Sequence, residues 1–307
     1  MVVTKTYFRN VVKDTPVTCE GFKGCFIECL YIIQCEEIEK VTEHPAKKIE
    51  ALRKRIRNYN SVIIAFSGGV DSTFLLMTAV EELRERALAV TLDTVLIPRR
   101  ELRNAQEIAH LLGANHTIIT ADPLKLPGVR GNSPERCYHC KKHLFGLLCQ
   151  LAREEGYQAV LDGANKDDQS DHRPGMRASM DLGVHSPLLE AGITKEEIRQ
   201  YSRTAGLPTW TKPEAACLAS RIPYGEEITV GKLKMIEEAE AYLNSLLNGQ
   251  VRVRWHRGVA RIETAVDAFP IILEHHQEIS ENIRKLGFSY VALDLMGYRR
   301  GSLNEVL

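Results

Sequence analysis

Short apolar runs alternate with longer amphipathic segments between residues 48 and 161. The apolar runs are bounded by turn residues and predict strands at residues 62–66, 88–92, 116–119 and 159–161. The segments between them carry apolar positions at helical spacing and predict helices over residues 48–58, 73–86, 100–112 and 135–154. This alternation is typical of βαβ units. We therefore expect the α/β fold class, with a doubly wound parallel sheet covered by helices on both faces.

The pattern changes after Pro223. It then predicts a helix, two strands, a second helix and a last strand, at residues 229–247, 251–256, 260–264, 267–286 and 290–295. This order is typical of a smaller C-terminal α+β domain. We expect three parts: an appendage of unknown role over residues 1–47, an α/β domain over 48–223, and a C-terminal domain over 224–307 for substrate binding or oligomerisation.

The charge balance argues against some classes of partner. The chain has 40 Lys and Arg against 40 Asp and Glu, whereas proteins that coat nucleic acid or anionic lipid rely on a basic excess. No run reaches the roughly 18 apolar residues of a membrane-spanning helix, and the first residues lack a signal-peptide pattern. We expect a cytoplasmic enzyme, in which the eight cysteines are thiols or metal ligands before they are disulfides.

The string SGGVDS, residues 67–72, lies between an expected strand and an expected helix. Gly68 and Gly69 let the backbone approach a ligand, and the first N–H groups of the helix can cradle an anion with the hydroxyls of Ser67 and Ser72. Asp71 would repel a phosphate unless a divalent cation lies between them, so we interpret it as a magnesium ligand. The lysine of the ordinary P-loop is missing. A turn that only caps the helix is the alternative.

Cys137 and Cys140 have CxxC spacing near the start of a helix, where both sulfurs can bind one metal and the helix dipole favours thiolate. Cys217 is a third candidate, on a later loop. Three thiolates would leave one iron of a cubane cluster open to an external sulfide. A zinc site that adds His139 or His143 and a redox pair remain alternatives.

The other cysteines carry weaker signals. Cys149 lies in an apolar helix stripe and is expected to pack in the core. Four lie in the appendage, at gaps that match no zinc or cluster spacing: Cys19, Cys25, Cys29 and Cys35. Incidental thiols are the simpler interpretation of these four.

The string SGGVDS after VIIAF resembles the pyrophosphate-binding loop of the N-type ATP pyrophosphatase (PP-loop) superfamily, whose members adenylate a substrate and let nitrogen or sulfur displace AMP. Five further strings, in this order, resemble the LarE family of ATP-dependent sulfur transferases: ERCYHCKKHLF, DGANKDDQSDHRPGMRA, KPEAACLASRIPYG, ARIE and LGFSYVALDLMGYRRGSLNE. The resemblance runs from about Lys48 to the C-terminus and leaves out the first 47 residues.

The resemblance implies a substrate and cofactors. The substrate would be pyridinium-3,5-biscarboxylic acid mononucleotide, whose carboxylates become thiocarboxylates during synthesis of the nickel-pincer cofactor of lactate racemase. ATP and Mg²⁺ would activate the carboxylate. The family draws sulfur from one sacrificed cysteine near the position of Cys217, or from a three-cysteine 4Fe–4S cluster that a sulfide donor refills. Cys137, Cys140 and Cys217 match the second kind, and a homo-oligomer is expected because family members often form rings.

The resemblance also assigns site residues. Ser67, Gly68, Gly69 and Ser72 would hold the pyrophosphate of ATP, and Asp71 and Cys217 would be catalytic. Further residues would contact the substrate: Asp168 and Arg173 on a loop over residues 162–177, Arg252 and Arg254 on one strand face, and Ser220, Arg221, Glu240 and Arg261. Solvated charge and an exposed strand face remain the alternatives for these polar residues.

Three other functions compete with this interpretation. A tRNA thiolase could use the same type of cluster, but RNA binding should bring a basic patch. An ammonia-dependent, AMP-forming amide ligase would need no cysteine triad. A non-catalytic nucleotide sensor would release no pyrophosphate from ATP.

Overall fold

The structure is a computed structural model that describes residues 46–170, 174–299 and 301. Contacts divide the chain into two units, Met1–Lys47 and Lys48–Leu307. The four cysteines of the appendage lie outside the described residues, and so does Arg173, one of the predicted substrate contacts.

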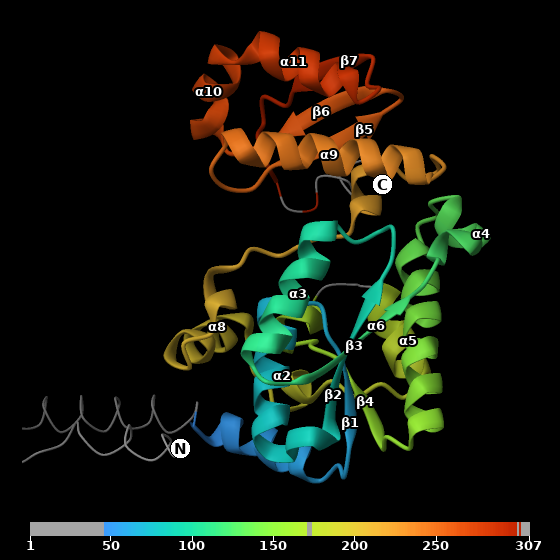
Figure 1. The fold of residues 1–307 in the computed structure, drawn as a ribbon, viewed down its shortest axis with the longest axis vertical. Helices are drawn as coiled ribbons and strands as arrows, with labels where there is room; N and C mark the ends of the chain where they lie inside the picture. The colour runs from blue at the N-terminus through green and yellow to red at the C-terminus, as the bar shows by residue number, and fades with distance from the viewer. Residues whose placement is uncertain (1–45, 171–173, 300, 302–307) are drawn as a thin grey trace, which may run out of the picture. The chain divides into compact units, whose positions relative to one another are not determined.

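A parallel sheet of four strands forms the centre of the α/β part (Figure 1). The strands lie in the order β3 (Asn115–Thr120), β2 (Ala87–Asp93), β1 (Val62–Ala65) and β4 (Ala159–Leu161). Ile63 of β1 is paired with Leu88 on one side and Val160 on the other. β1 is apolar throughout because both of its faces are covered.

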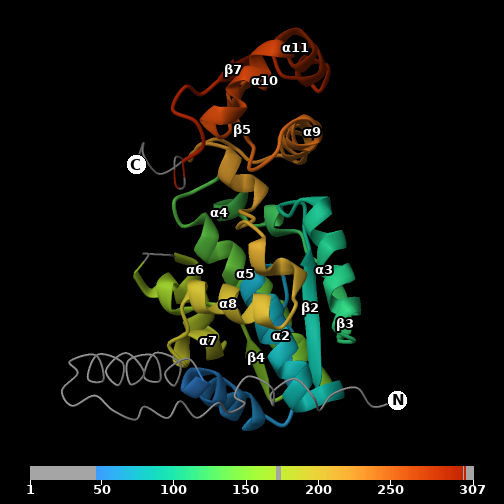
Figure 2. The same ribbon diagram turned by 90° about the vertical axis from the view of Figure 1, so that its left-hand side faces the viewer.

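Helices cover both faces of this sheet (Figure 2). On one face, α2 (Val70–Leu83) and α3 (Arg99–Leu111) share a core with Val62. On the other face, α5 (Arg136–Glu155) packs with Ile63. The predicted doubly wound α/β fold is therefore confirmed. In such sheets the loops after the two strands at the reversal of strand order, here β1 and β4, leave a crevice for a ligand.

Shorter helices complete this part of the chain. They are residues 46–57, α4 (Pro127–Arg130), α6 (Pro174–Asp181), α7 (Pro187–Glu190) and α8 (Lys195–Thr204). None of the helices in the described ranges combines the length and the apolarity that a membrane span requires.

The C-terminal part has a three-stranded sheet of its own. β5 (Arg252–His256) runs antiparallel to β6 (Val259–Glu263), and β7 (Tyr290–Leu293) runs parallel to β6. Its core includes Ile236 of α9 (Val230–Leu246) and extends to Ile222, on the other side of the boundary predicted after Pro223. The division at that boundary stays a prediction.

The single helix expected over residues 267–286 is wrong. α10 (Phe269–Glu274) and α11 (His276–Lys285) are separate helices. The backbone of His275, with a ψ of 18°, leaves the helical region between them. Apolar spacing alone does not reveal this break, because Ile272 and Ile279 would share a face in a continuous helix as well.

Gly68 lies where α3 crosses the loop between β1 and α2. Its φ is +66°, and an added Cβ would lie 2.8 Å from the backbone Cα of Ala105 in α3. Gly113 has a similar φ of +61° but nothing within 4 Å of an added Cβ. The two glycines therefore separate the effect of backbone conformation from the effect of crowding.

We predict that Gly113→Ala lowers the free energy of unfolding by about 1–2 kcal/mol, the usual cost of a left-handed residue with a side chain. Gly68→Ala should cost roughly 1–3 kcal/mol more, because α3 must move to admit the methyl group. Urea denaturation of both variants measures the difference. Equal losses of unfolding free energy in the two variants would contradict the prediction, because they would show that α3 moves away from the added methyl group at no measurable cost.

Candidate active site

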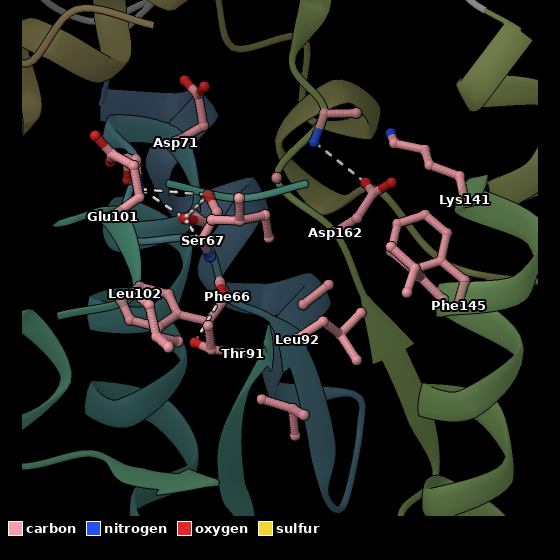
Figure 3. A pocket seen from close by; sticks show the side chains of 18 of the residues that line it. Phe66, Ser67, Asp71, Thr91, Leu92, Glu101, Leu102, Lys141, Phe145 and Asp162 are labelled. Carbon is pink, nitrogen blue, oxygen red and sulfur yellow. Dashed lines mark hydrogen bonds between the residues drawn. The ribbon is translucent and has the colours of Figure 1, made fainter. Parts of the chain in front are cut away.

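A cavity of about 390 Å³ lies at the carboxyl ends of β1, β2 and β4 (Figure 3). Its walls come from the loop Ser67–Ser72, from α3, from α5 and from the loop after β4. Apolar groups line the part beside the sheet, among them Phe66, which follows β1, and Leu92 of β2. The volume is in the range of sites for small molecules, which is about 300–1,000 Å³.

The loop after β1 presents polar groups to this cavity. The hydroxyl oxygens of Ser67 and Ser72 lie 3.1 Å apart, and the amide of Ser67 donates to Ser72 Oγ at 3.3 Å. Gly69 is the N-cap residue of α2 and has no side chain to bind the first N–H groups of the helix. Gly163, after β4, approaches so closely that an added Cβ would lie 3.1 Å from the amide nitrogen of Ser72. Such a loop at a helix N-terminus suits a phosphate group.

Asp71 combines an ion pair with an unpartnered oxygen. Its carboxylate pairs with Lys195 of α8, while the buried Oδ1 has no hydrogen-bond partner in the described part of the chain. Burial raises the pKa of Asp71, against the opposing effect of Lys195, and the charges of Asp168 and Glu214 raise it further. A buried carboxylate oxygen beside other acidic groups fits Mg²⁺, which binds through few carboxylates and through phosphate oxygens.

Two lysines at this site escaped the sequence reasoning. Lys195 follows Thr194, whose capping box with Glu197 begins α8. Lys212 donates to the carbonyl oxygen of Gly68 at 3.0 Å and pairs with Glu101 at 2.7 Å. The capping box was a readable signal for a helix start, but only the fold brings α8 to a loop more than 120 residues away.

The segment after β4 is only partly the loop that was expected. A 3-10 helix, Lys166–Ser170, and α6 interrupt it. Pro174 begins α6, a position that suits proline because its fixed φ is helical. Asp168 lines the cavity and accepts a bond from the amide of Asn165 at 3.0 Å, so its predicted substrate role stays a prediction.

Cys137, Cys140 and Cys217 share one neighbourhood. The first two lie in the first turns of α5, and Cys217 is the N-cap residue of a short 3-10 helix, Leu218–Arg221. Burial, followed by the charges of Cys217 and Cys137, raises the pKa of Cys140 from 9.0 to about 12. The expectation that the helix start favours thiolate is therefore wrong for Cys140, because burial outweighs the dipole.

The donor chemistry of these cysteines suits a thiolate-bound cluster. All three are free thiols and half-buried. Over the described ranges, however, no three His, Cys, Asp or Glu side chains are grouped as a metal site in their present positions. Cys149 lies elsewhere on α5, where it is partly buried and packs against the core between α5 and the sheet, with its thiol donating to the carbonyl oxygen of Leu182 at 3.9 Å.

Comparison with known proteins adds to this geometry. The family model for asparagine synthase matches residues 49–167. The uncharacterized protein slr1717 of Synechocystis sp. is 42% identical over 262 residues, which cover 85% of this chain and 98% of that protein. Pyridinium-3,5-bisthiocarboxylic acid mononucleotide synthase of Lactiplantibacillus plantarum is 36% identical over 263 residues, 85% of this chain and 95% of that enzyme. MJ0830 of Methanocaldococcus jannaschii is 33% identical over 248 residues, with 81% and 94% covered.

The chain belongs to the LarE family of PP-loop ATP pyrophosphatases. It is an ATP-using sulfur transferase, and its family uses ATP and Mg²⁺. The loop Ser67–Ser72 is accordingly called the PP-loop.

In this LarE-family enzyme, Arg221 and Glu240 form a buried pair next to Cys217. The guanidinium donates to both carboxylate oxygens, at 2.9 and 3.0 Å, and to the carbonyl oxygen of Cys217 at 2.8 Å. Ser220 Oγ donates to the same carbonyl at 2.8 Å. These contacts fix the backbone of Cys217. A substrate role for the three residues stays a prediction.

The remaining arginines lie on one face of the sheet β5–β6. Arg252 and Arg254 are only 5% and 6% exposed, so the alternative of an exposed strand face is wrong. Arg254 pairs with Glu263 at 2.8 Å, and so does Arg261. The two ion pairs fix the side chains of Arg254 and Arg261 on this face of the sheet.

Arg252 differs from its neighbours because it has no salt-bridge partner in the described residues. Its guanidinium donates to the carbonyl oxygens of Val251 at 2.9 Å and Glu214 at 3.3 Å, and it lies 5.7 Å from the ring centre of Tyr298. Burial and the charge of Arg221 lower the pKa of Arg252. A buried cation of this kind is suited to an incoming anion.

We predict that Cys140 resists alkylation in the folded, metal-free enzyme. A pKa of about 12 in place of 9.0 leaves roughly a thousandfold less thiolate at pH 8. The greater nucleophilicity of a more basic thiolate offsets part of this, so iodoacetamide should react about 30-fold more slowly than in urea-unfolded protein. Peptide mass mapping across pH 8–11 measures the rate. A plateau near pH 9 in the folded protein would contradict the prediction.

Proposed function

We propose that this enzyme adenylates a carboxylate of pyridinium-3,5-biscarboxylic acid mononucleotide with ATP and converts it to a thiocarboxylate for the nickel-pincer cofactor of lactate racemase. One observation carries the proposal: α5 contributes Cys140 to the cysteine group and lines the ATP cavity with the next residue, Lys141. Activation and sulfur delivery can then occur at the two sides of one helix. The 36% identity to the Lactiplantibacillus plantarum enzyme supports the choice of substrate.

Adenylation uses groups of the PP-loop and its neighbours. The amides at the start of α2 and the hydroxyls of Ser67 and Ser72 would bind the pyrophosphate of ATP. Asp71 would hold Mg²⁺ through its unpartnered Oδ1, and Lys195 would exchange part of its pairing with Asp71 for a phosphate oxygen. Fixed cations and amides around the transferring group stabilise the charge that develops there.

The three cysteines would hold a 4Fe–4S cluster, whose fourth iron can carry the sulfur that is transferred. In the metal-free protein the high pKa of Cys140 keeps its thiol protonated, so cluster binding releases a proton there. Arg221 and Glu240 keep the backbone of Cys217 in place for the third ligand. A separate sulfide donor would be needed for turnover. We further propose a homo-oligomer in the cytoplasm.

The first prediction from this proposal concerns iron. Protein purified without oxygen should contain about four iron and four labile sulfide per chain, and Cys217→Ala should lose most of both. Cys149→Ala is the matched control and should keep them, because that thiol packs against a different core cluster from Cys140 and Cys217. Zinc in the wild type, or full iron in Cys217→Ala, would reject the cluster. Sacrifice of Cys217 would instead appear as dehydroalanine by mass spectrometry.

The second prediction concerns Arg252. If it binds the substrate phosphate, Arg252→Gln should raise the KM for the pyridinium mononucleotide by about 10- to 100-fold, the equivalent of a lost charged hydrogen bond, and leave the KM for ATP nearly unchanged. Formation of AMP, with the thiocarboxylate detected by mass spectrometry, measures both constants. Arg130→Ala removes an exposed cation and serves as control. Parallel changes in both KM values would argue against the assignment.

A further inference from the structure

α8 carries three cations along one side. Lys195, Arg199 and Arg203 are spaced four residues apart, so their side chains are neighbours on the helix surface. Like charges at this spacing repel one another and weaken the helix that carries them. Lys195 pairs with Asp71 of the PP-loop, whereas none of the described residues forms a salt bridge with the two arginines. A row of charges that is unfavourable for the helix itself indicates that these side chains act on something outside it.

The two arginines hold the segment that leads to Lys212. The guanidinium of Arg199 donates to the backbone carbonyl oxygens of Trp210 and Lys212, the second at 2.9 Å. Arg203 lies 5.0 Å from the ring centre of Trp210. Trp210 belongs to a short 3-10 helix, Pro208–Thr211, and Lys212 follows it directly. Because a guanidinium is a rigid fork of donors, one side chain can bind both carbonyl oxygens and fix the backbone at the end of this helix.

The side chain of Lys212 in turn decides how one peptide group of the PP-loop is oriented. It donates to the carbonyl oxygen of Gly68 at 3.0 Å and pairs with Glu101 of α3 at 2.7 Å. In a trans peptide the N–H points away from the carbonyl oxygen, so the N–H of Gly69 points away from Lys212. Gly69 lines the cavity, and its amide donates to Ser67 Oγ at 3.4 Å. If this peptide turned over, it would present an oxygen instead of an N–H group to a bound phosphate.

We propose that Arg199 is a positioning residue for ATP: by fixing the backbone of Lys212, it keeps the peptide between Gly68 and Gly69 with its N–H toward the pyrophosphate. Both residues of this peptide are glycines, so no side chain opposes its rotation and the restraint must come from outside the loop. Arg199 is not among the residues that line the cavity, and it acts only through Lys212. The inference rests on the proposed function in one respect, the binding of pyrophosphate by the PP-loop.

Binding of magnesium pyrophosphate tests the proposal. Calorimetric titration of the full-length enzyme should show about tenfold weaker binding in Arg199→Ala, the usual effect of losing a charged hydrogen bond. Arg199→Lys keeps a donor but not the fork, and should lose roughly threefold. Gln200→Ala changes the exposed neighbour on the same helix and should bind like the wild type. Wild-type affinity in Arg199→Ala would overturn the proposal.

A double-mutant cycle shows whether Arg199 acts through Lys212. In a Lys212→Met background, Arg199→Ala should weaken pyrophosphate binding by less than about twofold, because no ammonium group is left to position. A general loss of stability would instead weaken binding by the same factor in both backgrounds. Equal factors in the two backgrounds would therefore reject the proposal.

Acetylation reports the position of Lys212 without any ligand. With limiting acetic anhydride, peptide mass mapping should show Lys212 reacting at least about fivefold faster in Arg199→Ala, since its two contacts open more often. Lys232, which pairs with Glu226 in the C-terminal part, should react at its wild-type rate. Unchanged acetylation of Lys212, or faster acetylation of both lysines, would contradict the role of Arg199. If the wild type binds no pyrophosphate, the assignment of the PP-loop is wrong, while the acetylation rates still decide whether Arg199 positions Lys212.

Discussion

The parallel pairing of β1 with β4 is the constraint on which the whole site depends. It places the PP-loop beside the loop that follows β4, although about ninety residues separate them in the chain. The two loops meet so closely at Gly163 and Ser72 that a side chain at Gly163 would crowd the amide of Ser72. Because the helices after β1 and before β4 lie on opposite faces of the sheet, a crevice opens at this reversal of strand order, and the cavity occupies it.

α5 brings two kinds of chemistry together. Helical geometry directs successive side chains about 100° apart, so neighbours in the chain can face different surroundings. Cys140 packs with the core of the C-terminal part, Lys141 lines the cavity, and Lys142 is exposed beside Tyr138. A position that suits a metal-binding thiol and a position that suits contact with a nucleotide are therefore neighbours in the sequence of this helix. A reaction that must carry a sulfur atom to an activated carboxylate needs this proximity.

The segment over residues 212–221 connects the wall of the cavity to the arginine-rich sheet β5–β6. Lys212 is bound to the PP-loop carbonyl of Gly68, the carbonyl of Glu214 accepts a bond from Arg252, and Arg221 holds the carbonyl of Cys217. The first and third contacts need the segment's own side chains, those of Lys212 and Arg221, whereas the second uses only the backbone carbonyl oxygen of Glu214. Cys217 is therefore positioned by both parts of the chain.

The sequence by itself determined the order of strands and helices, the doubly wound sheet, the PP-loop and the three candidate cysteines, because apolar periodicity and short motifs are local properties. It did not reveal the break at His275, α6 beginning at Pro174, or the high pKa of Cys140, since these depend on what surrounds each residue. The partners of Asp71 and Gly68, Lys195 and Lys212, come from more than 120 residues away in the chain. Only the tertiary structure decided them, because burial and long-range pairing are settled when the elements pack together.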